Sequence, residues 1–308
     1  MPKRLQNKIS ESRFTLPVTT ALTLAMWLLG GLFEKNSYEW IMLLGVSTYL
    51  MVELNNRNAL IRTYSRMVSC SFLVLTTAAA FTFNQPGTLR VQLCMILAYS
   101  VLLSGYQDKR AFGKVFYAFL FLGVASLSFI QILFFVPVLW VLMAANLMMF
   151  SPRTIPASLL GIITPYWFLA AYFILTDSLD VFVRNVAEIA DFAPLCRFDG
   201  VETHQLITFC YVSALSLLGT IHFLRNSYKD KIRTRMIYEM LIAMNAATFV
   251  FIILQPQYIE PLLGLLIITA GTLTAHFLAL TRTRITNIVF CLIVFSAAAL
   301  TLYNIWMS

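Results

Sequence analysis

The feature that most constrains this chain is a series of long apolar segments separated by short polar connections. A helix that crosses a bilayer needs about 20 apolar residues, with a working range of roughly 17–25. Eleven segments come near this length: residues 14–33, 39–55, 67–84, 91–106, 115–129, 131–150, 156–176, 204–224, 236–254, 260–280 and 286–305. The series predicts an all-α protein, a polytopic transmembrane helix bundle of about 11 spans that forms a single membrane domain over residues 1–308.

Composition agrees with that architecture. Hydrophobic residues make up 59% of the sequence and charged residues only 12%, whereas about 25% of a soluble domain is charged. The net charge of +8 lies in short loops beside apolar segments. That is the pattern of membrane insertion and not of a groove that follows nucleic-acid phosphates. The predicted surroundings are membrane lipids, with no nucleic-acid partner.

Residues 115–150 contain no charged side chain over 36 positions. One helix of that length would measure about 54 Å, against a hydrocarbon core of about 30 Å. The segment is therefore predicted to fold back, around Ser126–Gln131, as two helices.

The basic residues then fall on one side of the membrane. With the hairpin in place, 18 of the 22 Lys and Arg residues lie in the connections of one side. Cytoplasmic loops carry the excess of Lys and Arg, so the N-terminus is predicted to be cytoplasmic and the C-terminus outside. The first apolar run is longer than the core of a signal peptide and is interpreted as a retained first span.

The longest connection, residues 177–203, is predicted to be a periplasmic loop. Its first half has the apolar spacing of an amphipathic helix, with charged residues on the opposite face. A helix of this kind lies along the membrane surface. The apolar positions are Leu179, Phe182, Val183, Val186 and Ile189.

The same loop holds the best candidate functional residues. Arg197 and His204 are the predicted catalytic pair, because a guanidinium donates two parallel hydrogen bonds to phosphate and imidazole transfers protons near neutral pH. Arg184, Asp199 and Glu202 are predicted to assist in substrate binding. The alternative is structural: these charges pair with one another or with helix neighbours, and His204 caps the next helix.

A few polar residues occur within the apolar segments. Asn245 is a substrate-binding candidate, although such an amide also serves as an interhelical hydrogen-bond donor. His222 and His276 occur at similar depth, which would suit a proton relay or a metal pair. No third residue near either has metal-ligand spacing, so neither a metal nor a cofactor is predicted.

One part of the sequence resembles a known family. Tyr106-Gln-Asp-Lys-Arg110, Arg153 and Leu160-Gly-Ile-Ile-Thr-Pro-Tyr166 resemble a family of multi-pass inner-membrane proteins from Bacteroidetes-type bacteria, with Gly161 and Pro165 as its clearest markers. That family has no established activity, so the resemblance implies topology and location only. Arg197, Gly200 and His204 also resemble the periplasmic-loop residues of O-antigen polymerases and ligases.

Three functions remain open at this stage, and whether the protein is an enzyme is not decided by its sequence. The first is the handling of polyprenyl-phosphate-linked glycan precursors at the periplasmic face during cell-envelope assembly. The second is a non-catalytic subunit of a larger membrane protein complex. The third is a small-solute transporter, for which neither a repeat nor a row of buried charges is evident.

Overall fold

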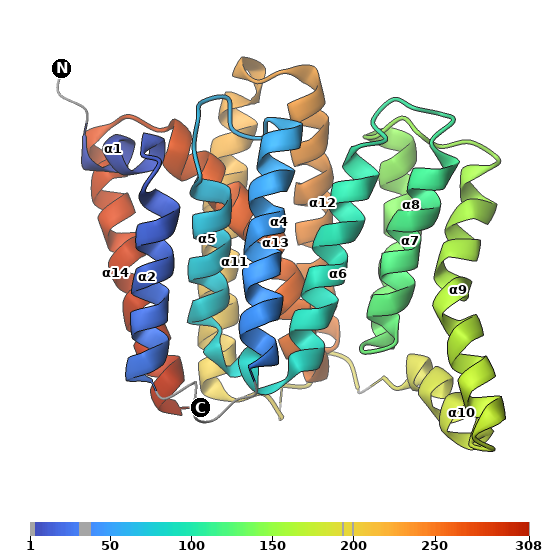
Figure 1. Ribbon diagram of the computed structural model, residues 1–308. Helices are drawn as coiled ribbons and strands as arrows, with labels where there is room; N and C mark the ends of the chain where they lie inside the picture. Colours follow the sequence, from blue (N-terminus) through green and yellow to red (C-terminus); the bar gives the residue numbers. More distant parts are fainter. Residues whose placement is uncertain (1–3, 31–37, 193, 199, 308) are drawn as a thin grey trace.

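The computed structural model describes residues 4–30, 38–192, 194–198 and 200–307, and all regular structure in these ranges is helical, as predicted (Figure 1). The α-helices are α1 (Leu5–Glu11), α2 (Thr15–Leu29), α4 (Glu39–Asn58), α5 (Met67–Ala78), α6 (Pro86–Leu103), α7 (Phe112–Ser126), α8 (Phe135–Ala145), α9 (Thr154–Leu175), α10 (Leu179–Ala187), α11 (Thr203–Asn226), α12 (Ile232–Leu254), α13 (Ile259–Leu280) and α14 (Arg284–Met307). Short 3₁₀ helices join them: η1 (Ala80–Asn84), η2 (Ile130–Phe134), η3 (Glu188–Ala190), η4 (Ser227–Lys229) and η5 (Pro256–Tyr258).

Each of the eleven apolar segments contains a helix, and these helices run side by side (Figure 1). Six helical segments are long and apolar enough to cross a membrane, namely those that contain α6, α9, α11, α12, α13 and α14. They indicate a membrane protein. The full number of 11 spans and the orientation of the termini stay predictions, and residues 31–33 of the first predicted span lie outside the described ranges.

The predicted hairpin in the charge-free stretch is confirmed. Helix α7 ends at Ser126 and η2 begins at Ile130, so the chain reverses where expected.

Helix α9 packs closely on α7 through two glycines. A Cβ atom on Gly161 would lie 2.5 Å from the carbonyl oxygen of Phe116, and one on Gly123 would lie 2.7 Å from that of Ile162.

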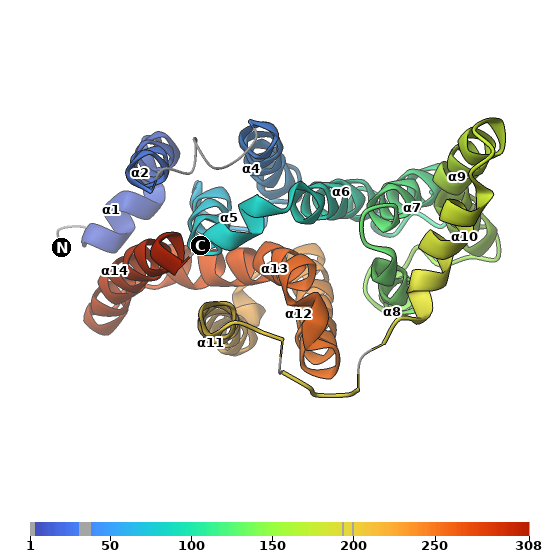
Figure 2. The same cartoon turned by 90° about the horizontal axis from the view of Figure 1, so that it is seen from below.

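Helix α13 forms the centre of the bundle. Its apolar window is 100% buried, and in Figure 2 it lies between α5 on one side and α11 and α12 on the other. Two buried amides hydrogen-bond to it: Gln92 Nε2 donates to the Gly264 carbonyl at 3.0 Å, and Asn245 Nδ2 donates to Thr269 Oγ1 at 2.8 Å. Such bonds are the usual way in which helices inside a membrane fix their neighbours.

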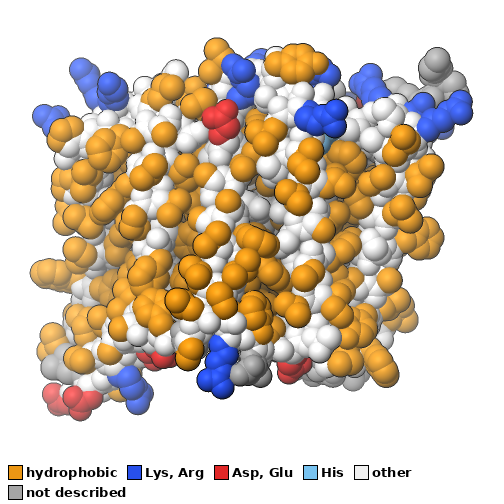
Figure 3. All heavy atoms as spheres, turned by 180° about the vertical axis from the view of Figure 1, so that it is seen from behind, with side chains coloured by type: hydrophobic (Ala, Val, Ile, Leu, Met, Phe, Trp, Pro, Cys, Tyr) orange, Lys and Arg blue, Asp and Glu red, His pale blue; other side chains and the backbone are white. Residues whose placement is uncertain are grey.

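The two ends of the bundle differ in charge. All the described Lys and Arg residues except Arg90, Arg184 and Arg197 belong to the end that carries α1 and the α11–α12 connection, which we call the cationic end. The opposite end carries α10 and the last turn of α14 (Figure 1). On the face seen in Figure 3, the charged side chains lie near the two ends, and hydrophobic side chains are spread over the region between them.

Candidate functional site

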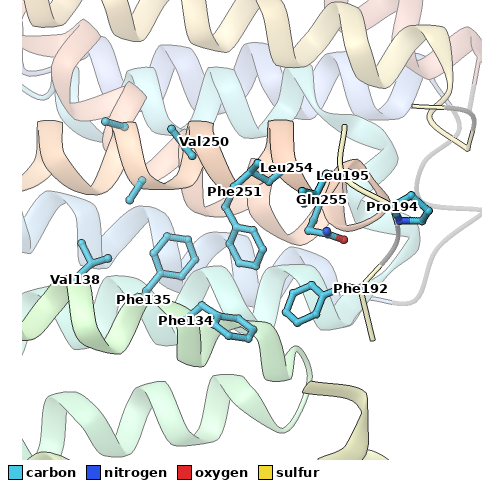
Figure 4. A pocket seen from close by; sticks show the side chains of 12 residues that line it. Phe134, Phe135, Val138, Phe192, Pro194, Leu195, Val250, Phe251, Leu254 and Gln255 are labelled. Atoms are coloured by element: carbon cyan, nitrogen blue, oxygen red, sulfur yellow. The ribbon is translucent and has the colours of Figure 1, made fainter. Parts of the chain in front are cut away.

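A large apolar groove opens near the end opposite the cationic end (Figure 4). Its volume is about 920 Å³. One wall is formed by Phe134, Phe135 and Val138 of η2 and α8, and the other by the α12 residues Ala246, Ala247, Val250, Phe251 and Leu254. Phe192, Pro194 and Leu195 of the 177–203 loop lie across one end of it.

The sequence explains why this space stays open. Helix α8 has only 11 residues, and α12 presents two alanines where larger residues would close the gap. The remaining walls are aromatic: the ring centroid of Phe251 lies 5.9 Å from that of Phe134 and 5.8 Å from that of Phe135. Phe134 also contacts Phe192, at 5.4 Å between centroids. Rings at these separations pack favourably and make a stiff apolar surface.

The loop across the groove is held by polar contacts with the bundle. Gln131 Nε2 donates to the Glu188 carbonyl at 3.0 Å and to Tyr258 Oη at 2.8 Å. Tyr258 Oη in turn donates to the Asp191 carbonyl at 2.5 Å, and the Cys196 amide donates to the Leu254 carbonyl at 3.3 Å. The position of this loop relative to η2 and α12 is therefore fixed by the bundle.

A second, polar cleft of about 350 Å³ lies at the same end of the molecule. Its polar lining comes from four separate parts of the chain: Gln85, Thr88, Ser128, Gln205, Gln257 and Glu260. Gln205 Nε2 donates to Glu260 Oε1 at 3.0 Å, while the buried Glu260 Oε2 has no hydrogen-bond partner among the described residues. Because a buried carboxylate oxygen normally accepts a hydrogen bond, this cleft presents an acceptor to a ligand or to water.

Arg197 belongs to the segment that connects the two spaces. Leu195 lines the apolar groove, whereas Gly200 and Val201 line the polar cleft. The exposed Arg197 stands between them in the chain. Along the chain, the order is thus a residue of the apolar groove, an arginine and two residues of the polar cleft.

The structure brings two of the predicted site residues together. His204 Nδ1 lies 3.0 Å from Glu202 Oε2, although the two atoms are not aligned as a hydrogen bond. His204 is only 3% exposed and its ring packs against Phe81 of η1, with 5.1 Å between centroids. Glu202 caps α11 by accepting from the Gln205 amide. Both residues thus have evident structural roles at the start of α11.

The other predicted residues are distributed more widely. Arg184 is exposed on α10, the helix that the loop spacing predicted. Asn245 is buried and faces Thr269 of α13, while its neighbour Ala246 lines the groove. Asp199 lies outside the described residues.

Sequence reasoning did not identify either of the two spaces. The groove pairs residues about 115 positions apart, and the polar cleft joins glutamines whose separate positions carry no recognisable motif. Comparison of this chain with models of protein families, with curated proteins and with solved structures finds no match.

Proposed function

We propose that this protein binds a polyprenyl-phosphate-linked glycan precursor in the bacterial inner membrane, at the periplasmic ends of its helices. The observation that carries the proposal is the position of Arg197 in the chain, between Leu195 of the apolar groove and Gly200 and Val201 of the polar cleft, at one end of the bundle. An amphiphile with an apolar chain, a phosphate and a sugar has its three parts in the same order.

Each part of the site suits its part of the ligand. The groove, with its aromatic and aliphatic walls, offers an isoprenoid chain more contact than a flat helix face does. A guanidinium binds phosphate through parallel hydrogen bonds. Amide, hydroxyl and carboxylate groups placed in a concave surface fix the orientation of a polar ligand, and sugar hydroxyls both donate to and accept from such groups.

The orientation follows from the charges in this proposal. The cationic end faces the cytoplasm according to the positive-inside rule, which puts the groove and the polar cleft at the periplasmic face. All eleven apolar helices then cross the membrane, and α10 lies along its outer surface.

Because His204 is enclosed by Phe81 and Glu202, we assign the site a binding function and no chemical step.

The proposal is tested by the lipids that purify with the protein. We expect mass spectrometry of gently solubilised protein to detect a polyprenyl-phosphate species. Ala246→Phe places a ring in the groove and should reduce the bound lipid at least several-fold. The matched control is Ala171→Phe, at an exposed position of α9.

Arg197→Ala is the corresponding test of phosphate recognition, with Arg90→Ala as its control at the same end of the molecule. Arg90 pairs with Glu39 at 2.8 Å and lines neither space. If only ordinary phospholipids are bound, or if all four variants retain the polyprenyl species equally, the proposed function is wrong. A strain without the protein should also accumulate a lipid-linked precursor.

A further inference from the structure

A hydrogen-bonded row of three titratable side chains lies at the cationic end, far from the groove. His222 of α11 and His276 of α13 face each other, with 3.3 Å between their Nδ1 atoms. The other ring nitrogen of His276, Nε2, lies 3.1 Å from Oδ2 of Asp230 in the α11–α12 connection. His276 is 0% exposed and the Asp230 side chain 2%, whereas His222 is half-buried.

The chemistry of these groups fixes where the protons are. An ionised carboxylate only accepts hydrogen bonds, so His276 Nε2 carries the hydrogen that bonds to Asp230. The Nδ1 of a neutral His276 is then an acceptor, and His222 Nδ1 must be the donor of the bond between the rings. Nε2 of His222 is consequently left with its lone pair free to take a proton.

The geometry points to a one-proton relay site in which Asp230, His276 and His222 take up a proton from the aqueous phase at the cationic end. We infer that the proton enters on Nε2 of His222, the half-buried member. The Nδ1 hydrogen of His222 then passes to Nδ1 of His276. Charge is conserved in both steps, and the positive charge ends on His276 beside the Asp230 carboxylate.

The same contacts limit the site to a single proton. If both rings were imidazolium ions, two Nδ1–H donors would face each other across 3.3 Å, and neither Nδ1 hydrogen would have an acceptor in this contact. Two like charges at that distance strongly oppose the second protonation. The pair therefore titrates as one unit and not as two independent histidines.

The neighbouring groups set the balance of charge. Arg62, from the α4–α5 connection, places Nη1 3.7 Å from Asp230 Oδ1, and Lys229 precedes Asp230 in the chain. On α12, the ring of the fully buried Tyr238 lies 4.8 Å from that of His276, between centroids. Arg62 and Lys229 oppose proton uptake, whereas Asp230 favours it.

A bound metal is the competing interpretation of two facing Nδ1 atoms, because a carboxylate often orients a metal-bound histidine in the same way. Among the described residues, no group of three or more His, Cys, Asp or Glu side chains is placed to hold a metal ion. The two interpretations predict different protonation of the rings. A metal keeps both Nδ1 atoms free of hydrogen, whereas the relay requires a hydrogen on Nδ1 of His222.

The experiment is nitrogen-15 NMR of the histidine rings in the full-length protein, reconstituted in lipid nanodiscs and titrated with acid. The chain has only 3 histidines, and His204→Gln removes the third signal. We expect one Nδ1–H ring and one Nε2–H ring at high pH, followed by the uptake of one proton that shifts both rings together.

Two substitutions should move the midpoint of that uptake in opposite directions. Asp230→Asn removes the charge that stabilises the imidazolium, so it should weaken proton binding about tenfold. Arg62→Gln removes an opposing charge at a partly exposed position and should tighten it on the order of threefold. Asp108→Asn is the control and should leave the midpoint unchanged, since Asp108 lies in the α6–α7 connection at the same end and pairs with Lys114 of α7.

Three results would overturn the inference. In the first, the rings titrate separately and neither Asp230→Asn nor Arg62→Gln moves them. In the second, both rings carry their hydrogen on Nε2 at high pH. In the third, a stoichiometric metal is found by elemental analysis and its removal changes the ring signals. Arg62→Gln keeps the test available if Asp230→Asn does not fold.

Discussion

The close packing of α7 on α9 leads to a quantitative prediction. Gly161→Ala would place a Cβ atom 2.5 Å from the Phe116 carbonyl oxygen and 2.9 Å from the Leu120 amide nitrogen. Both atoms belong to the α7 backbone and cannot rotate away. Ordinary contact begins near 3.4 Å, so the helices must separate by about 0.9 Å, the difference between these values.

The magnitude is obtained by comparison with a glycine that has free space. Gly45 lies within α4, and a Cβ atom there would meet nothing within 4 Å. Alanine improves helix propensity by about 1 kcal/mol at either position. The difference between Gly161→Ala and Gly45→Ala therefore isolates the packing cost, which for an overfilled contact is about 1–3 kcal/mol. That corresponds to a roughly 5- to 150-fold change in the ratio of folded to unfolded protein.

The assay is reversible unfolding in mixed micelles with increasing denaturing detergent, followed by tryptophan fluorescence and helical circular dichroism. Gly161→Ala should unfold at a lower detergent fraction than Gly45→Ala, which should unfold at the same fraction as the parent protein or a higher one. Equal stability of the two variants would show that α7 and α9 are not in the close contact described above.

Three further predictions concern single side chains. Gln131→Leu leaves the Tyr258 hydroxyl without its donor, so the free energy of unfolding should fall by about 1–3 kcal/mol and proteolysis of the 177–203 loop should become faster. Asn245→Ala removes the bond to Thr269 and should cost about 0.6 kcal/mol, with an upper value near 1.7, measured in the same unfolding assay. Cys196 is exposed and should react with a membrane-impermeant maleimide added to intact spheroplasts; labelling only after permeabilisation would reverse the proposed orientation.

The helices could be predicted because each follows from a local pattern. Apolar length located eleven helical segments, and absence of charge over residues 115–150 required the hairpin that the structure shows. Local pattern did not predict α1, because its seven residues are too few and too polar to form a recognisable apolar segment. It also did not predict the end of α5 at Ala78, after which the predicted span continues as the 3₁₀ helix η1.

The candidate site was less accessible from the sequence, because its parts come together only in three dimensions. The loop and Arg197 could be identified, since an arginine opposite the cationic side is unusual. The groove depends on the gap between α8 and α12, and the polar cleft on glutamines from distant segments. His204 is buried because its ring packs against Phe81 of η1, which lies about 120 residues earlier in the chain.

The central position of α13 has a consequence for how the protein is made. This helix is 100% buried over its apolar window and yet lies in the tenth of the eleven apolar segments, so nine of them are synthesised before it. Until the translocon releases residues 259–280, Gln92 and Asn245 lack the partners that α13 provides, and the surrounding helices enclose an unfilled centre. A nascent chain that ends before residue 280 therefore has an incomplete core in the bilayer. A nonsense mutation after α12 should yield a product that membrane proteases degrade.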